Sequence, residues 1–185
     1  MRLLIIGPQG AGKGTQAGLL AQAYGIPHVS TGDLFRANIT GGTELGRKVQ
    51  EYLNSGALVP DEVTQDMVVD RIEQQDAQAG FLLDGFPRNP AQATWLEQLL
   101  KDRGSPIDVV LLLQAPDEVL IGRMMARGRD DDTEEAIAKR LSIYHSETEP
   151  LVEFYADRLV AVDGVGEIAQ VQQRIRSAID AKLAG

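Results

Sequence analysis

Short runs of consecutive apolar residues alternate along this chain with longer segments in which apolar residues recur at helical spacing. The apolar runs lack polar alternation, which is typical of strands covered on both faces in a parallel sheet. They predict strands at Arg2–Ile6, His28–Val29, Phe81–Leu83, Val109–Leu113 and Val160–Val162. The amphipathic segments predict helices near residues 13–24, 31–40, 43–54, 61–78, 90–101, 117–127, 133–157 and 167–182.

This alternation predicts an α/β fold with a doubly wound, parallel, five-stranded sheet in three layers. Two segments interrupt the pattern. Helices follow one another between the second and third strands, so residues 30–59 are expected to form a helical excursion from the core. The segment Arg123–Thr133 is short, polar and dense in charge, and we expect a mobile loop there.

Composition narrows the possible functions. The 185 residues suffice for one domain, and the net charge of −9 argues against general affinity for nucleic acid or anionic membranes. Because there is no cysteine, disulfides, thiolate nucleophiles and cysteine-bound zinc are excluded. The first apolar run, Leu3 to Ile6, is too short for a signal peptide or a membrane span, so we expect a cytoplasmic protein.

A glycine-rich loop follows the first predicted strand directly. It reads Gly7-Pro8-Gln9-Gly10-Ala11-Gly12-Lys13-Gly14-Thr15. This fits G-x-x-x-x-G-K, the start of a phosphate-binding P-loop, in the strand–loop–helix context that the motif requires. Glycines let backbone N–H groups converge on phosphate oxygens, and the helix N-terminus adds positive potential. Lys13 can reach the outer phosphates, whereas the hydroxyl expected beside it comes one position late, at Thr15.

A carboxylate ends the third predicted strand. Asp84 follows Phe81–Leu83 and therefore lies at the carboxyl edge of the sheet, where open α/β folds bind ligands. Alone, an aspartate before Gly85 would be a turn residue. Beside a P-loop, Asp84 is predicted to hold Mg²⁺ through water, together with Thr15.

Further motifs point to the acceptor of the phosphoryl group. They are Ser30-Thr31-Gly32-Asp33-Leu34-Phe35-Arg36, Gly85-Phe86-Pro87-Arg88 and Gln92. With these motifs and the K-G-T version of the P-loop, the chain closely resembles the adenylate kinases, within the nucleoside monophosphate kinase family, from Met1 to about Gly166. The D-G-F-P-R motif is more specific than the P-loop. The resemblance implies reversible, Mg-dependent phosphoryl transfer from ATP to AMP, giving two ADP, and a role in adenine nucleotide homeostasis.

The resemblance also implies an organisation and a set of ligands. It predicts a single P-loop kinase domain over residues 1–185, with a core of 1–29, 60–122 and 134–185, a monophosphate-binding subdomain of 30–59 and a short lid at about 123–133. Mg²⁺ is expected to enter with ATP, and the inserted zinc-binding lid of some relatives is absent. The expected partners are ATP, AMP and ADP, without nucleic acid or membrane, and we expect a monomer.

Residue roles follow from the matched motifs. The resemblance assigns ATP binding to Gly10, Ala11, Gly12, Lys13, Gly14, Thr15, Arg123, Arg127 and Gly166. It assigns AMP binding to Thr31, Arg36, Ala57, Leu58, Val59, Gly85, Phe86, Pro87, Arg88, Gln92, Arg129 and Arg140. It implies positive charge on the transferring group from Lys13, Arg88, Arg123, Arg129 and Arg140. Taken without the motif, Arg36 and Arg88 would be solvated surface arginines, and Gln92 an exposed helix residue.

Arginine density in the lid needs a reason in so acidic a chain. One interpretation is a salt-bridged surface loop in which Asp130–Asp132 and Glu134–Glu135 neutralise the arginines. The other is phosphate binding. The two interpretations are compatible if the arginines pair with aspartates in an open state and with phosphates in a closed state.

Other functions remain open on the sequence. Thr31 with Gln92 favours AMP, but Asn89 is shared with some pyrimidine enzymes, so a UMP/CMP kinase is the nearest alternative. A non-catalytic ATP-binding switch module is the alternative from another class, in which Arg36 and Arg88 would have no task. No general base is required, because the second pKa of a phosphate monoester is about 6. His28 and His145 are therefore expected to be structural.

Overall fold

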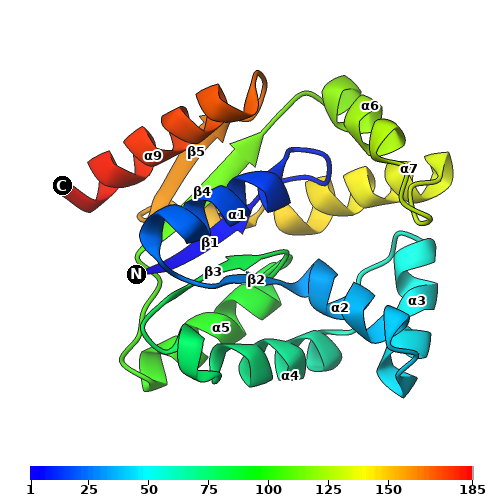
Figure 1. Ribbon diagram of the computed structural model, residues 1–185, viewed down its shortest axis with the longest axis horizontal. Helices are drawn as coiled ribbons and strands as arrows, with labels where there is room; N and C mark the ends of the chain where they lie inside the picture. The colour runs from blue at the N-terminus through cyan, green and yellow to red at the C-terminus, as the bar shows by residue number, and fades with distance from the viewer. Residues whose placement is uncertain (185) are drawn as a thin grey trace.

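A five-stranded parallel sheet forms the centre of the computed structural model, which describes residues 1–184 (Figure 1). Gly185, the last residue of the predicted core, lies outside the described residues. The strands are β1 (Arg2–Ile6), β2 (His28–Ser30), β3 (Phe81–Asp84), β4 (Val109–Gln114) and β5 (Leu159–Asp163). All five predicted strands are confirmed, and so is the doubly wound α/β fold class.

Helices connect the strands and cover both faces of the sheet. They are α1 (Lys13–Tyr24), α2 (Thr31–Thr40), α3 (Glu44–Asn54), α4 (Asp61–Ile72), α5 (Pro90–Asp102), α6 (Asp117–Arg127), α7 (Glu134–Ile143), α8 (Leu151–Phe154) and α9 (Ile168–Ala184). Within residues 1–184, no helix is long and apolar enough to cross a membrane.

The strand order β2-β3-β1-β4-β5 places β1 in the middle of the sheet. Leu4 of β1 pairs with Leu83 of β3 and Val110 of β4. Successive residues of a strand point to opposite faces. Leu3 and Ile5 accordingly pack in one apolar cluster with α1 and α9, whereas Leu4 packs in another with α4 and α5. Figure 1 shows these two helix layers on either side of the sheet. Burial on both faces explains the absence of polar alternation in the strands.

Two predicted helices are wrong in extent. The helix expected at 61–78 ends at Ile72, and a 3₁₀ turn follows at Gln75–Ala77. Arg71 holds that turn against the helix end, because its guanidinium donates two hydrogen bonds of 2.9 Å to Asp76. The chain can thereby reverse and enter β3.

The helix expected at 133–157 is broken into parts. α7 ends at Ile143, and a π-helical segment follows at Tyr144–Thr148, closed by the Glu149 N–H donating to the Tyr144 carbonyl at 2.8 Å. Proline has no N–H with which to continue a helix, and Pro150 stands directly before α8. An apolar pattern of helical period does not reveal a widened turn.

The excursion at 30–59 is helical, as predicted, and consists mainly of α2 and α3. Ser30 and Thr43 cap these helices by accepting from backbone N–H groups of the first turn. The helices share a small apolar cluster, Phe35, Val49 and Val59, which is separate from the two clusters of the sheet. In Figure 1 they lie at one end of the molecule, beside α7. The role of this unit as a monophosphate-binding subdomain stays a prediction.

The loop expected at Arg123–Thr133 is shorter than predicted. α6 continues through Arg127 and ends at Gly128, which adopts the left-handed conformation common at helix ends, with φ of 61°. Thr133 then caps α7 by accepting from the Ala136 N–H at 3.2 Å. Arg123 and Arg127 therefore extend from a helix, and only Arg129 of the lid arginines lies in the loop.

Candidate active site

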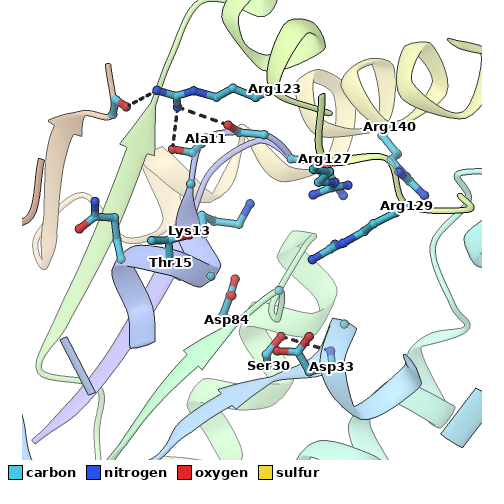
Figure 2. A pocket seen from close by; sticks show the side chains of 18 of the residues that line it. Ala11, Lys13, Thr15, Ser30, Asp33, Asp84, Arg123, Arg127, Arg129 and Arg140 are labelled. Atoms are coloured by element: carbon cyan, nitrogen blue, oxygen red, sulfur yellow. Dashed lines mark hydrogen bonds between the residues drawn. The ribbon is translucent and has the colours of Figure 1, made fainter. Parts of the chain in front are cut away.

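A cavity of about 690 Å³ lies at the carboxyl edge of the sheet (Figure 2). The P-loop forms its floor, and the start of α2 lines one side. Its wall is completed by the Asp84–Gly85 turn, the α3–α4 connection, the lid arginines and the β5–α9 loop. This edge is where doubly wound sheets bind ligands.

Glycines shape the P-loop for close approach. Gly10 and Gly12 have φ of 87° and 97°, a region that other residues adopt only with strain. A Cβ at Gly10 would lie 2.6 Å from the Leu120 carbonyl oxygen. α1 begins at Lys13, so its unpaired N–H groups face the cavity, and all six predicted P-loop residues, Gly10 to Thr15, line it.

The ammonium group of Lys13 is turned onto the loop itself. Its Nζ donates to the carbonyls of Gly7 and Pro8 at 2.7 and 2.8 Å. Burial lowers the pKa of Lys13 to about 8, an effect that the charge of Asp84 opposes and those of Arg88 and Arg127 reinforce. A phosphate group would replace two neutral acceptors with a charged one.

Asp84 is buried at the end of β3, facing the P-loop. A Cβ at Gly14 would lie 3.9 Å from its Oδ2, an ordinary van der Waals contact, so Asp84 lies directly beside the start of α1. Among residues 1–184, no group of three His, Asp or Glu side chains could hold a metal ion. The donor set is instead one carboxylate and the nearby hydroxyl of Thr15. Mg²⁺ suits such a site, because it binds few protein oxygens and keeps waters and phosphate oxygens as its other ligands.

His28 was expected to be structural, but it lines the cavity. Its Nε2 lies 3.3 Å from Oδ2 of Asp84, across from β2 to β3. Because β2 pairs with β3 in register His28 to Leu82, the imidazole lies beside the strand end that carries Asp84. No motif marked this residue, and only the strand order, which the sequence did not reveal, brings it to the site.

Two predicted phosphate-binding arginines, Arg36 and Arg88, line the cavity. The Nη2 of Arg36 pairs with Asp33 Oδ1 at 2.5 Å, one helical turn away. Arg88 has no carboxylate partner in the described chain, and its Nε donates to the Gly85 carbonyl at 2.7 Å. Burial lowers its pKa, as do Arg140 and Arg36, while Asp84 opposes them. A half-buried guanidinium without a carboxylate partner is a strong site for an anion.

Several predicted acceptor residues lie behind the cavity wall instead. Thr31, Leu58, Val59, Phe86, Pro87 and Gln92 do not line this cavity, whereas Ala57 and Gly85 do. Phe86 is fully buried and packs edge-on against Trp95, with ring centroids 5.8 Å apart. The Gln92 Oε1 accepts from the Arg88 N–H at 2.7 Å, and its Nε2 donates to Asp61 at 2.6 Å. These residues shape the loop that carries Arg88.

The lid arginines fall into two groups. Arg127 makes hydrogen bonds of 2.5 and 2.7 Å to Asp132, and Arg140 bonds Asp132 at 2.8 Å, Asp131, and the Leu53 carbonyl at 3.0 Å. Of the carboxylates expected to neutralise these arginines, Asp131 and Asp132 do so, whereas Asp130, Glu134 and Glu135 make no ion pair within residues 1–184. Arg129 makes no ion pair within residues 1–184, and Figure 2 shows its side chain extended into the space below Arg127 and Arg140. Burial, Arg127 and Arg36 lower the pKa of Arg129.

Arg123 has a different environment. Its guanidinium donates to the Gly10 and Ala11 carbonyls at 3.4 and 3.3 Å and to the Gly164 carbonyl at 3.0 Å (Figure 2). It thus joins the P-loop to the β5–α9 loop, on which Gly166, also predicted to bind ATP, lines the cavity. The cationic residues of the cavity are Lys13, Arg36, Arg88, Arg123, Arg127, Arg129 and Arg140. In a chain of net charge −9, this concentration provides a site for a polyanion.

Comparison with known proteins shows the family to which the sequence is similar. The adenylate kinase family pattern matches residues 5–160. A protein named adenylate kinase from Thermobifida fusca is 53% identical over 188 residues, covering 98% of this chain and 100% of the relative. Proteins of the same name from Corynebacterium urealyticum and Nocardia farcinica are each 51% identical, covering 97% of this chain and 99% of the relative.

Proposed function

The chain belongs to the adenylate kinase family, and on that premise we propose how its residues move a phosphoryl group between ATP and AMP. The reaction is ATP:AMP phosphotransfer, which yields two ADP and runs in both directions. The alternatives of a pyrimidine monophosphate kinase and a non-catalytic switch are not favoured. The observation that carries the assignment of roles is the row of cations around one cavity, between the P-loop and the Gly85–Arg88 turn.

ATP is proposed to occupy the P-loop side. Backbone N–H groups of Gly10 to Thr15 hold its phosphates, and Lys13 leaves the carbonyls of Gly7 and Pro8 to bind them. Arg123 and Arg127 flank the same loop. Gly166 lies on the wall where the base would be placed.

AMP is proposed to occupy the opposite side, with its phosphate between Arg36 and Arg88. Planar guanidinium groups bind phosphate oxygens through two hydrogen bonds at once. Gln92 retains one amide hydrogen and one oxygen lone pair beyond its bonds to Asp61 and Arg88. Such a pair matches the N1 acceptor and N6 donor of adenine, so we propose that Gln92 reads the base when the neighbouring segment Ala57–Val59 moves.

Magnesium is proposed to be held by Asp84 and Thr15, through water. When bound, Mg²⁺ neutralises phosphate charge and helps align the transferring group. His28 supports this role by contacting Oδ2 of Asp84, the carboxylate oxygen that also lies near Gly14 of the P-loop, and so helps to orient the carboxylate.

Transfer requires two polyanions to approach in line. Arg88, Arg129 and Arg140 surround the region between the two sites and are proposed to offset the negative charge there. Arg127 and Arg140 must first exchange Asp131 and Asp132 for phosphate oxygens. That exchange draws the lid over the cavity and excludes water, which protects the transferring group from hydrolysis.

The test combines acceptor choice with one substitution. Purified protein is incubated with Mg-ATP and, separately, with AMP, UMP, CMP, GMP or no acceptor, and the products are separated by chromatography. ADP is expected only with AMP, and none after chelation of magnesium. Lys13→Met is expected to lose about 100-fold or more in kcat, by analogy with loss of a charge-stabilising donor. Lys101→Met, on the exposed side of α5, serves as the matched control.

Different experimental results would contradict different parts of the proposal. An undiminished rate in Lys13→Met would remove the P-loop lysine from the mechanism. CDP or UDP as the main new product would overturn the assignment of Gln92 to adenine while leaving the phosphate sites in place. We also propose that a monomer suffices, since each proposed contact comes from one chain.

A further inference from the structure

The β5–α9 loop is fixed between two guanidinium groups. On the cavity side, Arg123 Nη2 donates to the Gly164 carbonyl at 3.0 Å. On the far side, Arg174 of α9 donates from Nη1 to the Asp163 carbonyl at 2.6 Å and from Nη2 to the Val165 carbonyl at 2.5 Å. Three successive carbonyls of the loop are therefore occupied by arginine donors. These hydrogen bonds restrict the conformation of the loop and determine which of its backbone groups face the cavity.

Gly166 is the residue that this arrangement leaves available. Within residues 1–184, neither its N–H nor its carbonyl has a hydrogen-bond partner in the protein, and it lines the cavity with φ of 120°. The neighbouring groups are occupied, because the Gly164 N–H donates to the Gln114 carbonyl and the Val165 N–H to the Asp163 carboxylate. Gly166 can therefore offer both its N–H and its carbonyl to the edge of a base at this wall.

An apolar surface lies next to Gly166. Ile168 is 55% exposed and lines the same cavity, beside the buried Val171. The Gln16 side chain donates to the Ile168 carbonyl at 3.1 Å and so ties the start of α9 to α1. A hydrophobic side chain beside unoccupied backbone groups is suited to the face and edge of a nucleobase.

Arg174 itself has no access to the nucleotide. It lies outside the cavity lining, with 38% of its side chain exposed on the far side of the loop. A Cβ at Gly166 would lie 3.0 Å from its Nη2, so the guanidinium directly underlies the glycine. Its planar fork is suited to two carbonyls at once, which a lysine ammonium cannot bind in the same geometry.

We propose that Arg174 is a positioning residue for the donor nucleotide, because it holds the Asp163–Gly166 loop in the one conformation that turns Gly166 toward the base of ATP. The inference rests on the proposed function, which places the donor base at this wall. The inference predicts an effect on one substrate only. Loss of Arg174 weakens the interaction with ATP and leaves the acceptor side, across the cavity, unchanged.

The experiment measures both substrates in matched variants. Arg174→Ala is expected to raise KM for ATP about 3- to 10-fold, the effect of losing one or two net hydrogen bonds. KM for AMP and kcat at saturating ATP are expected to stay at the wild-type values. Arg174→Lys is expected to restore part of the loss. Arg176→Ala, an exposed residue on the same helix without a bond to the loop, controls for the change in charge and is expected to match wild type.

Two results overturn the inference. One is an unchanged KM for ATP in Arg174→Ala. The other is an equal rise in KM for both nucleotides together with a lower melting temperature, which would indicate a general structural role. Calorimetric binding of ATP without AMP separates this inference from the proposed function. If wild-type protein binds ATP but transfers nothing, the proposed function fails, while weaker ATP binding by Arg174→Ala still supports the positioning role and equal binding overturns it.

Discussion

At the residue scale, the pKa of Lys13 is expected to change when a nucleotide binds. Without nucleotide, its ammonium group is buried against two neutral carbonyls, and its pKa falls to about 8. Bound phosphates would favour the charged form and raise that pKa again. The free protein thus carries a neutral Lys13 only above about pH 8, whereas the nucleotide complex carries a charged one well beyond it.

Binding of ATP is therefore expected to take up protons at pH 9 and to take up almost none through Lys13 at pH 7. Calorimetry in buffers of different ionisation enthalpy measures this uptake directly. Lys13→Met should abolish the uptake at pH 9. Equal proton uptake at both pH values, or uptake that survives in Lys13→Met, would contradict the role of this group.

The sequence identified the residues whose chemistry is tied to a local motif. Lys13, Arg36 and Arg88 line one cavity, because short motifs place them at the ends of predicted strands or within the first helical turns, and their binding roles stay predictions. His28 and Gly164 were missed. They reach the cavity through strand order and loop contacts, which depend on residues far away in the chain.

At the scale of elements, the proposed function makes carboxylates and phosphates compete for Arg127 and Arg140. Asp132 is 1% exposed and bonds both Arg127 and Arg140. Burial alone would raise its pKa, but the two guanidinium groups outweigh burial and hold the pKa below the usual value. Stabilisation by Asp132 is hence present at neutral pH and is lost as the pH falls below about 4.

Asp132→Asn is expected to lower the stability of the free protein and to tighten ATP binding. The stability loss should be about 1–3 kcal/mol, the cost of weakening a buried charged hydrogen bond. ATP should bind about 2- to 5-fold more tightly, because Arg127 and Arg140 would lose weaker hydrogen bonds to residue 132 when they move to the phosphates. Urea denaturation and calorimetry measure the two effects.

Asp130→Asn is the matched control for that prediction. Asp130 lies in the same loop, is exposed, and makes no ion pair in the described chain. It should change neither quantity. Unaltered or weaker ATP binding in Asp132→Asn would indicate that the pairing with Arg127 and Arg140 does not oppose substrate binding.

Elements were predicted well where the backbone hydrogen bonding follows the apolar period, and poorly where the hydrogen bonding changes while the period continues. The strands and α1 to α3 agree with their predicted positions. The π-helical segment at Tyr144–Thr148 and the 3₁₀ turn at Gln75–Ala77 keep roughly helical spacing of apolar side chains. Local hydrogen bonding, rather than side-chain pattern, decides the structure there.

For the whole molecule, β1 joins the two apolar clusters on opposite faces of the sheet. Leu4 is fully buried in the middle of that strand. Leu4→Ala should cost about 3–5 kcal/mol in free energy of unfolding, through lost burial and a cavity that the neighbouring strands cannot close. Leu19→Ala, on the exposed side of α1, should cost about 1 kcal/mol or less. Similar losses at both positions, measured by urea denaturation, would contradict the central place of β1.

The central position of β1 also determines how long this strand stays unpaired during synthesis. Arg2 pairs with Phe81 and Leu3 with Val109, so the earliest strand to leave the ribosome has neither neighbour for a long interval. About 75 residues separate Ile6 from Phe81, so at translation rates of about 5–20 residues per second that interval is roughly 4–15 s. Throughout it, the Arg2–Ile6 segment is an unpaired apolar strand. Slow translation or crowding by other nascent chains would therefore reduce the yield of active enzyme without altering the stability of the finished fold.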